Sequence, residues 1–372
     1  MKGIKEIAEK LSLDISNRGL GDPFLSSSKC KVYPLELEKF HKIESPKVNR
    51  KMAFIDGGNQ TILSTPEYSI QANRVYFNIF NGSKRILPES NIPRRIEFFS
   101  LTSLKFDGNE FYYETTLSPD KDEFKEYLPE EEDLKFKATD REIMVGTSAD
   151  IARVASMARR FAEWSLSKHI IDLELDSNDI LVRDGSLQTS LTNESKYTEN
   201  AFNEAKKKEV IFTGLSKTCS LPTSTGLSLI GSIQRYAEEC NIQLDKWCYG
   251  PIFRANSEIH KAIVVAVKLN KSADRIFRFE IFEDNISNEN NELNSEILDI
   301  VSSITQNSKD IRFPGYPYGL IDADKWARVK NEELNVFKIQ LKSEISKTGV
   351  WKKLNPHIKA INGHDKLDGV YR

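Results

Sequence analysis

The sequence lacks paired cysteines and long apolar runs. Its four cysteines form no C-x-x-C pair, which argues against both a zinc ribbon and a disulfide framework. No apolar run is long enough to span a bilayer. We therefore expect a protein of the reducing cytoplasm without a membrane segment.

The chain also lacks a strong net charge. Lysine and arginine number 53 and aspartate and glutamate 55, so the formal net charge is −2. A polyanion would therefore have to bind a local basic surface, not the field of the whole protein. A hydrophobic content of 39% and a charged content of 29% are typical of globular proteins and exclude a disordered chain.

Hydrophobic periodicity predicts both strands and helices. The stretch 52–117 is rich in β-branched and aromatic residues, and Asn-Gly at 81–82 supplies a hairpin turn, so we expect a strand meander there. Residues 148–171 carry apolar side chains at steps of three and four, which predicts a helix. The highly charged stretch 119–136 is expected to be a solvated loop or an exposed helix.

The remaining elements complete an alternating order. At the N-terminus, Ile4, Ile7, Ala8 and Leu11 have helical spacing interrupted by charge, unlike the core of a signal peptide. Such a helix could contact a second protein or belong to the core. Strands are expected at 179–185, 209–217, 247–253, 259–270 and 275–282, and helices at 194–207, 292–306 and 320–346. This order predicts an α/β fold with one central mixed sheet flanked by helices.

Two aspartates end apolar runs in the same way. Asp56 lies in MAFIDGG (52–58) and Asp184 in ILVRDGSL (180–187). Asp-Gly is a common turn dipeptide, so each is either a turn residue or a carboxylate at the end of a buried strand. If the strands are neighbours, the two carboxylates converge and repel each other unless a cation lies between them. Oxygen ligands of this kind suit Mg²⁺ or Mn²⁺.

Two further carboxylates lie on predicted helices. Glu163, in RRFAEW, adjoins the apolar stripe of its helix, and it is either a metal ligand or an ordinary i, i+4 partner of Arg159. Asp324, in LIDADKWA, is either a ligand or a first-turn aspartate stabilised by the helix dipole.

Six motifs in one order resemble the archaeal NurA nucleases. They are AFIDGG, RRFAEW, LVRDGSL, IFTGLSK, FPGYPYGLIDADKWA and the terminal GHDKLD. The resemblance runs from about residue 50 to the C-terminus. It implies an RNase H-like fold with added helices at both ends, in which residues 1–50 form a helical extension and loop and residues 51–372 the nuclease domain.

The resemblance also implies an activity and partners. It implies Mn²⁺-dependent cleavage of single- and double-stranded DNA by a homodimer, as a 5′–3′ exonuclease and single-strand endonuclease. The implied partner is the hexameric ATPase and DNA translocase HerA, in end resection of double-strand breaks beside the Mre11 and Rad50 proteins.

The resemblance assigns roles to residues by their motifs. Asp56 becomes the first-strand metal ligand, Glu163 the helix ligand and Asp184 the second-strand ligand. Asp324 takes the terminal-helix position, where some family members look to have histidine. This change replaces a neutral ligand with an anionic one, so we expect tighter metal binding.

Four more residues are candidates for contact with the substrate. Lys217 and Tyr316 match a lysine and a site tyrosine of the family. Lys217 could neutralise a phosphate or be an ordinary exposed lysine. Tyr316 could orient a phosphate, stack on a splayed base, or merely stiffen its Gly-Pro loop. Arg159 and Arg160 are candidates for contact with the DNA backbone, although one of them is expected to pair with a carboxylate.

Phosphodiester hydrolysis needs an activated water and a stabilised leaving group, and two divalent ions about 3.5–4 Å apart serve both. The four carboxylates are what such a pair of ions would require.

One alternative function is that of an actin-like sugar or acetate kinase, because FIDGGNQTI resembles a phosphate loop, although 18 glycines are few for that class. The others are an inactive DNA-binding scaffold and a single-strand-binding module. Ser186 is not in a G-x-S-x-G turn, so serine hydrolysis finds no support.

Overall fold

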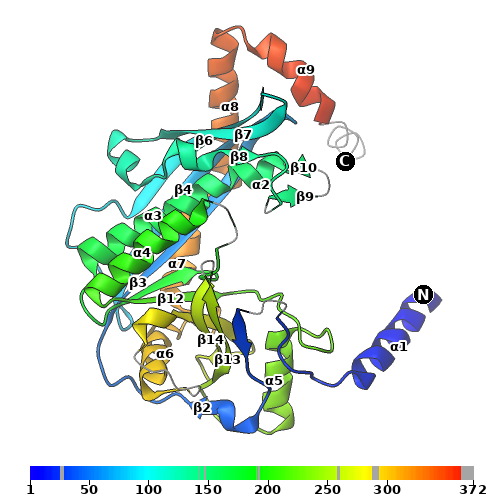
Figure 1. The fold of residues 1–372 in the computed structure, drawn as a ribbon, viewed down its shortest axis with the longest axis vertical. Coiled ribbons are helices and arrows are strands. Elements are labelled where there is room, and N and C mark those ends of the chain that lie inside the picture. The colour runs from blue at the N-terminus through cyan, green and yellow to red at the C-terminus, as the bar shows by residue number, and fades with distance from the viewer. Residues whose placement is uncertain are drawn as a thin grey trace.

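The structure is a computed structural model that describes residues 1–25, 29–141, 143–145, 148–189, 191, 193–257, 260–286 and 293–361. Figure 1 shows a large twisted sheet with helices packed along it. Helices α8 (Asn331–Lys347) and α9 (Trp351–Ile361) lie at one end, and helix α1 (Lys2–Asn17) projects near the other. The terminal GHDKLD motif lies outside the described residues.

Five strands form the centre of the sheet in the order β6–β4–β3–β11–β12. Strand β3 is antiparallel to β4, and β4 to β6, whereas β11 is parallel to both β3 and β12. An antiparallel meander followed by two strands parallel to its first strand is the arrangement of the RNase H-like fold, so this expectation is confirmed. The bounds are β3 Lys51–Ser64, β4 Tyr68–Asn81, β6 Arg95–Asp107, β11 Ile180–Asp184 and β12 Ile211–Ser216.

The sheet continues on both sides of this centre. Strands β7 and β8 follow β6, while β15, β14 and β13 follow β12. The first 50 residues, expected to form only a helix and a loop, add strands β1 and β2 to β13. Strand β5 pairs with β4, and β9 and β10 form a separate pair. The bounds are β1 Cys30–Val32, β2 Phe40–Lys42, β5 Lys84–Ile86, β7 Glu110–Pro119, β8 Phe136–Lys137, β9 Met144–Val145, β10 Ser148–Ala149, β13 Trp247–Ser257, β14 His260–Lys268 and β15 Phe277–Phe282.

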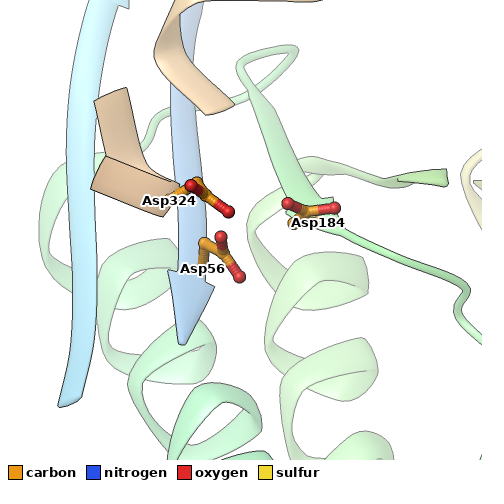
Figure 2. Close-up of side chains that lie close together, drawn as sticks. All are labelled: Asp56, Asp184 and Asp324. Atoms are coloured by element: carbon orange, nitrogen blue, oxygen red, sulfur yellow. The ribbon is translucent and has the colours of Figure 1, made fainter. Parts of the chain in front are cut away.

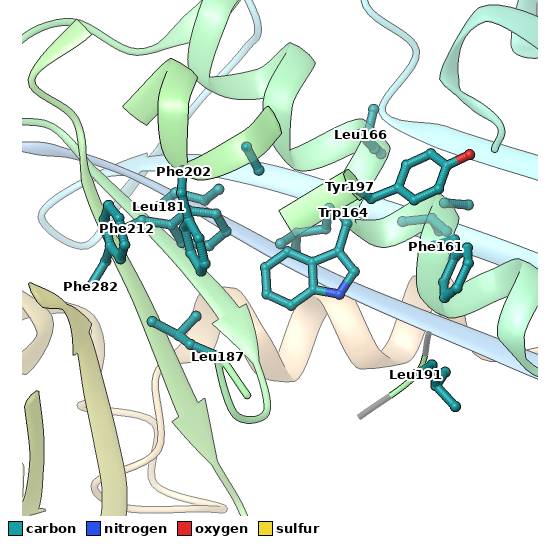
Figure 3. Packing of buried hydrophobic residues seen from close by; sticks show 14 of the residues in the cluster. Phe161, Trp164, Leu166, Leu181, Leu187, Leu191, Tyr197, Phe202, Phe212 and Phe282 are labelled. Carbon is teal, nitrogen blue, oxygen red and sulfur yellow. The ribbon is translucent and has the colours of Figure 1, made fainter. Parts of the chain in front are cut away.

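Different helices cover the two faces of the sheet. Strand β11 carries apolar side chains on both faces, because both faces are covered by helices. Leu181 packs in the hydrophobic cluster formed with α3 and α4, and Val182, on the opposite face, packs in the hydrophobic cluster formed with α6 and α7. Figure 3 shows the first cluster, in which Trp164 packs close to Phe202 and Phe212. The helices are α2 Ile151–Ala155, α3 Met157–Glu174, α4 Glu194–Lys208, α5 Leu229–Glu239, α6 Ser295–Asn307, α7 Tyr318–Ala327, α8 Asn331–Lys347 and α9 Trp351–Ile361, with 3₁₀ turns η1 Leu37–Lys39, η2 Asp122–Tyr127, η3 Glu131–Leu134 and η4 Glu283–Asn285.

The prediction of a single helix over 320–346 is wrong, because the helix is interrupted between α7 and α8. Arg328 has extended backbone angles, and the buried side chain of Val329 packs in a small cluster with Leu334. The backbone carbonyls of Arg328 and Val329 accept hydrogen bonds from the side chains of Arg74 and Gln60. Tertiary contacts therefore satisfy the carbonyls that would otherwise continue the helix.

The helix expected over 148–171 also has two parts. Residues 148–149 form β10, and α2 and α3 meet at Ser156.

The charged stretch 119–136 contains the short turns η2 and η3, in which Phe124, Tyr127 and Leu134 are buried. That stretch is therefore not wholly solvated.

Helix α1 (Lys2–Asn17) lies away from the core. None of its residues is buried, and Ile4, Ile7 and Leu11 are each more than half exposed. The interpretation of its apolar positions as core is therefore wrong. In the described part of the chain no helix is both long and apolar enough to cross a membrane.

Gly319 sets the distance between α7 and strand β3. A Cβ atom at this position would lie 2.1 Å from the Phe54 ring, which is completely buried and has no room to move. We expect Gly319→Ala to lower the free energy of unfolding by about 1–3 kcal/mol, as overpacking of a core does. Thermal or denaturant unfolding measures this effect. Unchanged stability would contradict the packing argument.

Candidate active site

Asp56 and Asp184 come from neighbouring parallel strands. Ile55 of β3 pairs with Arg183 of β11, so the two aspartates follow adjacent positions at the same level of the sheet. Asp184 ends its strand, but Asp56 does not. Strand β3 continues through Gly57 and Gly58 to Ser64, so Asp56 is not a turn residue, and the expected strand end is wrong.

The two glycines after Asp56 allow helices to approach the strand. A Cβ atom on Gly57 would lie 2.3 Å from Oε1 of Glu163 on α3, and one on Gly58 would lie 2.6 Å from the backbone oxygen of Ala327 on α7. The Asp-Gly-Gly sequence therefore serves close packing and not a turn. Its result is that α3 and α7 both reach the strand next to Asp56.

Three carboxylates converge at this point. One oxygen each from Asp56, Asp184 and Asp324 lies within 4.8 Å of the others. Figure 2 shows the three side chains directed toward one another from β3, β11 and α7. Asp324 lies in the last turns of α7, not near the start of a long helix. The donor set is three hard oxygen ligands, which fits a divalent cation such as Mg²⁺ or Mn²⁺.

The electrostatics of the cluster favour additional positive charge. Burial, together with the negative charges of Asp184 and Glu163, raises the pKa of Asp56 well above its ordinary value. Nζ of Lys217 lies 2.6 Å from Oδ2 of Asp184 and 3.0 Å from Oδ1 of Asp324. Burial alone would lower the pKa of Lys217, but the carboxylates of Asp184, Asp56 and Asp324 together outweigh burial and the pKa is raised. One ammonium group thus offsets part of the repulsion among the three carboxylates.

Tyr316 contacts the cluster through its hydroxyl group. The side chain is completely buried, and its ring packs against Phe277 and Phe313. Its Oη donates a hydrogen bond to Oδ1 of Asp184 at 3.2 Å. A buried ring cannot stack on a splayed base, so the stacking interpretation is wrong. The hydroxyl group instead fixes the orientation of Asp184.

Removing this hydroxyl group tests that role. We expect Tyr316→Phe to weaken binding of Mn²⁺ by about tenfold, because removing a partner of a metal ligand usually lowers metal affinity by about 10–100-fold. Stability should change by only about 1 kcal/mol, since the ring packing is kept. Titration with Mn²⁺ and unfolding curves of the variant measure the two effects. Tyr318→Phe, two residues later at the start of α7 and exposed, is the control. An unchanged affinity of Tyr316→Phe for Mn²⁺ would show that Asp184 needs no such anchor.

Glu163 lies beside the three carboxylates and is held by arginines. Its carboxylate pairs with Arg159 on the same helix and, at 2.7 Å, with Nη2 of Arg183. Burial alone would raise the pKa of Glu163, but the two arginines lower it. Both interpretations from the sequence keep support, because the predicted i, i+4 pair is present and the side chain adjoins Asp56.

The arginines of α3 are engaged with carboxylates. Arg159 pairs with Glu163, and Arg160 pairs with Glu194 and also donates to the backbone oxygen of Gln188 at 3.0 Å. Trp164 donates to the same Glu194 at 2.9 Å. Sequence reasoning expected one of the two arginines to pair, and the structure pairs both.

Sequence reasoning did not single out Arg183 and Glu280. Arg183 is buried, donates to the backbone oxygen of Ser186 at 3.0 Å and lies 4.4 Å from the Trp164 ring. Glu280 is buried and accepts hydrogen bonds from the backbone N–H of Leu187, at 3.1 Å, and from His260, at 2.7 Å. A charged residue inside an apolar strand, as in ILVRD and RFEIF, was the available signal. These contacts hold the loop that follows Asp184.

A sequence profile of the NurA domain matches residues 50–329. No curated protein matches the chain. Among solved structures, a NurA crystal structure has a TM-score of 0.48 at 8% identity over 87% of this chain and 92% of that one. Endonuclease V of Ciona intestinalis, bound to a 24mer DNA that contains an inosine followed by a ribo-adenosine, has a TM-score of 0.37 at 11% identity over 79% and 89%. An Argonaute of Aquifex aeolicus has a TM-score of 0.28 at 10% identity over 75% and 28%.

TM-scores below 0.5 at such low sequence identity are too low to support a conclusion about the site. The profile match is independent of them, covers most of the chain and contains Asp56, Glu163, Asp184 and Asp324. It also removes the actin-like kinase as an alternative. The chain belongs to the NurA family and is a nuclease.

Proposed function

We propose that this nuclease is a Mn²⁺- or Mg²⁺-dependent deoxyribonuclease that hydrolyses phosphodiester bonds of single- and double-stranded DNA. The observation that carries the proposal is the convergence of carboxylate oxygens of Asp56, Asp184 and Asp324 within 4.8 Å. A cluster of three carboxylates in a partly buried position favours cations, and Lys217 and Arg328, which pair with its members, supply two positive charges against three negative ones.

The residues that would hold two divalent ions are Asp56, Asp184 and Asp324, with Glu163 as the fourth carboxylate. Such ions, when bound, generate a hydroxide nucleophile and stabilise the leaving oxygen of the phosphodiester. Glu163 would first have to exchange part of its pairing with Arg159 and Arg183. The anionic Asp324 would bind a cation more tightly than a neutral histidine does.

The chain's own residues orient the reactants. Lys217, one third exposed, can turn from the carboxylates toward a phosphate oxygen of the substrate. Tyr316 holds Asp184 through its hydroxyl group. Arg159, whose side chain is about one quarter exposed, and Arg160 remain the candidates on α3 for contact with the DNA backbone.

The family suggests a wider role, which belongs to the same proposal. We propose that residues 51–372 form the nuclease domain of a cytoplasmic homodimer and residues 1–50 an extension. Its role would be 5′–3′ exonuclease and single-strand endonuclease activity in resection of DNA double-strand breaks, with a HerA-type hexameric ATPase and with Mre11 and Rad50. The exposed helix α1 is a suitable contact for a second subunit or for the ATPase, because its apolar positions are not buried.

The test is a cleavage assay with end-labelled single- and double-stranded DNA in Mn²⁺, Mg²⁺ or EDTA. We expect shortening of the DNA with either ion and none in EDTA. Asp184→Asn should be inactive, whereas Asp14→Asn, a change of the same kind on exposed α1, should be fully active. If DNA stayed intact with each ion, even with a HerA-type ATPase and ATP present, the proposal would fail and an inactive DNA-binding scaffold would replace it.

A further inference from the structure

An arginine-rich hollow lies beside helix α7. It is lined by Tyr76, Arg85, Arg94, Arg95 and Trp326 and has a volume of about 440 Å³. We call these five residues the arginine hollow. Its lining combines three cations with two aromatic side chains, which is the composition that nucleic-acid-binding surfaces use.

The arginine hollow adjoins the active site through both β4 and α7. Tyr76 of β4 pairs directly with Asp56 of β3 in the antiparallel ladder. Tyr76 also packs against Ala323 and Ala327, so α7 lies over it. Asp324 reaches the active site from one side of this helix. Trp326 follows two residues later, and residues two apart on a helix point in different directions. One helix therefore separates the hollow from the carboxylates.

The aromatic wall of the hollow is open to solvent. Trp326 is 44% exposed, whereas Tyr76 behind it is 6% exposed. The two rings are stacked, with centroids 6.2 Å apart and planes inclined by 28°. An exposed indole face can accept a nucleic acid base by stacking. Tyr76 supports the indole from behind, so Trp326 can offer its face to a flat ligand.

The arginines of the hollow differ in their pairing. Arg85 is bound to the buried Asp322 and lies 3.4 Å from the hydroxyl group of Tyr76, so it forms part of the wall. Arg94 and Arg95 are exposed, and within the described residues neither has an ion-pair partner. They leave two positive charges uncompensated at the rim, in a protein whose net charge is negative. This favours an anionic ligand.

We propose that the arginine hollow binds single-stranded DNA next to the phosphodiester that is cleaved. A base stacks on Trp326, and Arg94 and Arg95 contact phosphates of the same strand. Single-stranded DNA fits best because the bases of a duplex already cover their faces by stacking, whereas an exposed indole needs an unstacked base. The inference rests on the proposed function and adds to it the path of the substrate.

Binding without cleavage tests this directly. In an Asp56→Asn background with Ca²⁺, fluorescence anisotropy measures the affinity for a labelled thymidine oligonucleotide. We expect Trp326→Ala to weaken binding by between about fivefold and about a hundredfold, and Trp326→Phe to keep most of the affinity. The Arg94→Ala, Arg95→Ala double variant should reduce the slope of log affinity against log salt by about 1.4, since each lost phosphate contact contributes about 0.7.

Matched controls remove the same chemistry elsewhere. Phe106→Ala deletes an exposed aromatic ring, and the Arg235→Ala, Arg312→Ala double variant deletes two exposed arginines. Both should bind single-stranded DNA as the background does, apart from a small uniform effect of net charge. Unfolding curves confirm that each variant is folded.

The outcomes separate the inference from the proposed function. If wild type cleaves DNA but the hollow variants bind with unchanged affinity and salt slope, the hollow is not the path of the strand. If the hollow variants instead lose binding only to polyglutamate, an acidic protein is the ligand and the inference is overturned. If wild type fails to cleave any DNA while the hollow variants show the expected losses, only the proposed cleavage fails.

Discussion

Replacing Asp56 with asparagine is expected to abolish DNA cleavage and to stabilise the metal-free protein. Residues that support metal ligands already contribute about 10–100-fold, so loss of a ligand should lower the rate at least about 100-fold. Asparagine keeps the oxygen that accepts the Gly57 N–H at 2.8 Å, so the local backbone is retained. It removes one of three carboxylates whose oxygens lie within 4.8 Å, and with it much of their repulsion.

The two effects have separate measurements. In EDTA, the unfolding temperature of Asp56→Asn should rise by about 1 °C, which corresponds to about 1 kcal/mol in a chain of this size. In Mn²⁺, wild type should gain stability by ligand linkage, and the variant should gain much less. Asp14→Asn on α1 should match wild type in all three assays. A variant that kept its activity, or that lost stability in EDTA, would contradict the assignment of Asp56 to a metal site.

Replacing Arg183 with methionine is expected to give the largest loss of stability. Arg183 is 5% exposed and pairs with Glu163, which is 1% exposed, so the change leaves a buried carboxylate with Arg159 as its remaining partner. Removing one member of a buried ion pair typically costs about 3–5 kcal/mol. Because Arg159 still offsets part of the charge, we expect about 3 kcal/mol. Cleavage should fall as well, since Arg183 also holds the loop after Asp184.

Denaturant unfolding of a double-mutant cycle isolates the pair. Glu163→Gln combined with Arg183→Met should be more stable than the sum of the single effects predicts, because neither member is then left as an unpaired charge. Arg183→Lys keeps the charge but loses the planar guanidinium that contacts both Glu163 and the backbone oxygen of Ser186, so it should lie between wild type and Arg183→Met. Arg235→Met, at an exposed position of α5, should have little effect. Additive effects in the cycle would show that Glu163 and Arg183 are not coupled.

The convergence of Asp56 and Asp184 could be predicted from the sequence. Both follow short apolar runs, and such runs form parallel strands whose carboxyl ends meet at one edge of a sheet. The same reasoning placed Asp56 at a strand end, which was wrong. Strand β3 continues because β4 pairs with it through Gly57 and Gly58. That pairing is a property of the partner strand, which the local Asp-Gly-Gly pattern does not show.

The partners of the charged residues were only partly predictable. Spacing along α3 predicts the pair of Arg159 with Glu163, because residues four apart share a helix face. The second partner of Glu163 is Arg183 of strand β11, and this pair depends on how β11 packs under α3. The break between α7 and α8 has the same origin, since side chains of β3 and β4 bind the carbonyls at the break.

By itself, the sequence determined the alternation of strands and helices, the acidic residues of the site and the family, because these depend on periodicity and on short motifs. Only the tertiary structure decided which charges meet. Tyr316 and Asp184 are 132 residues apart in the chain yet share a hydrogen bond, and the arginine hollow is assembled from β4, β5, β6 and α7 with the residues just before β6. Such contacts depend on the packing of remote elements, in which burial and distance set the strength of each charge.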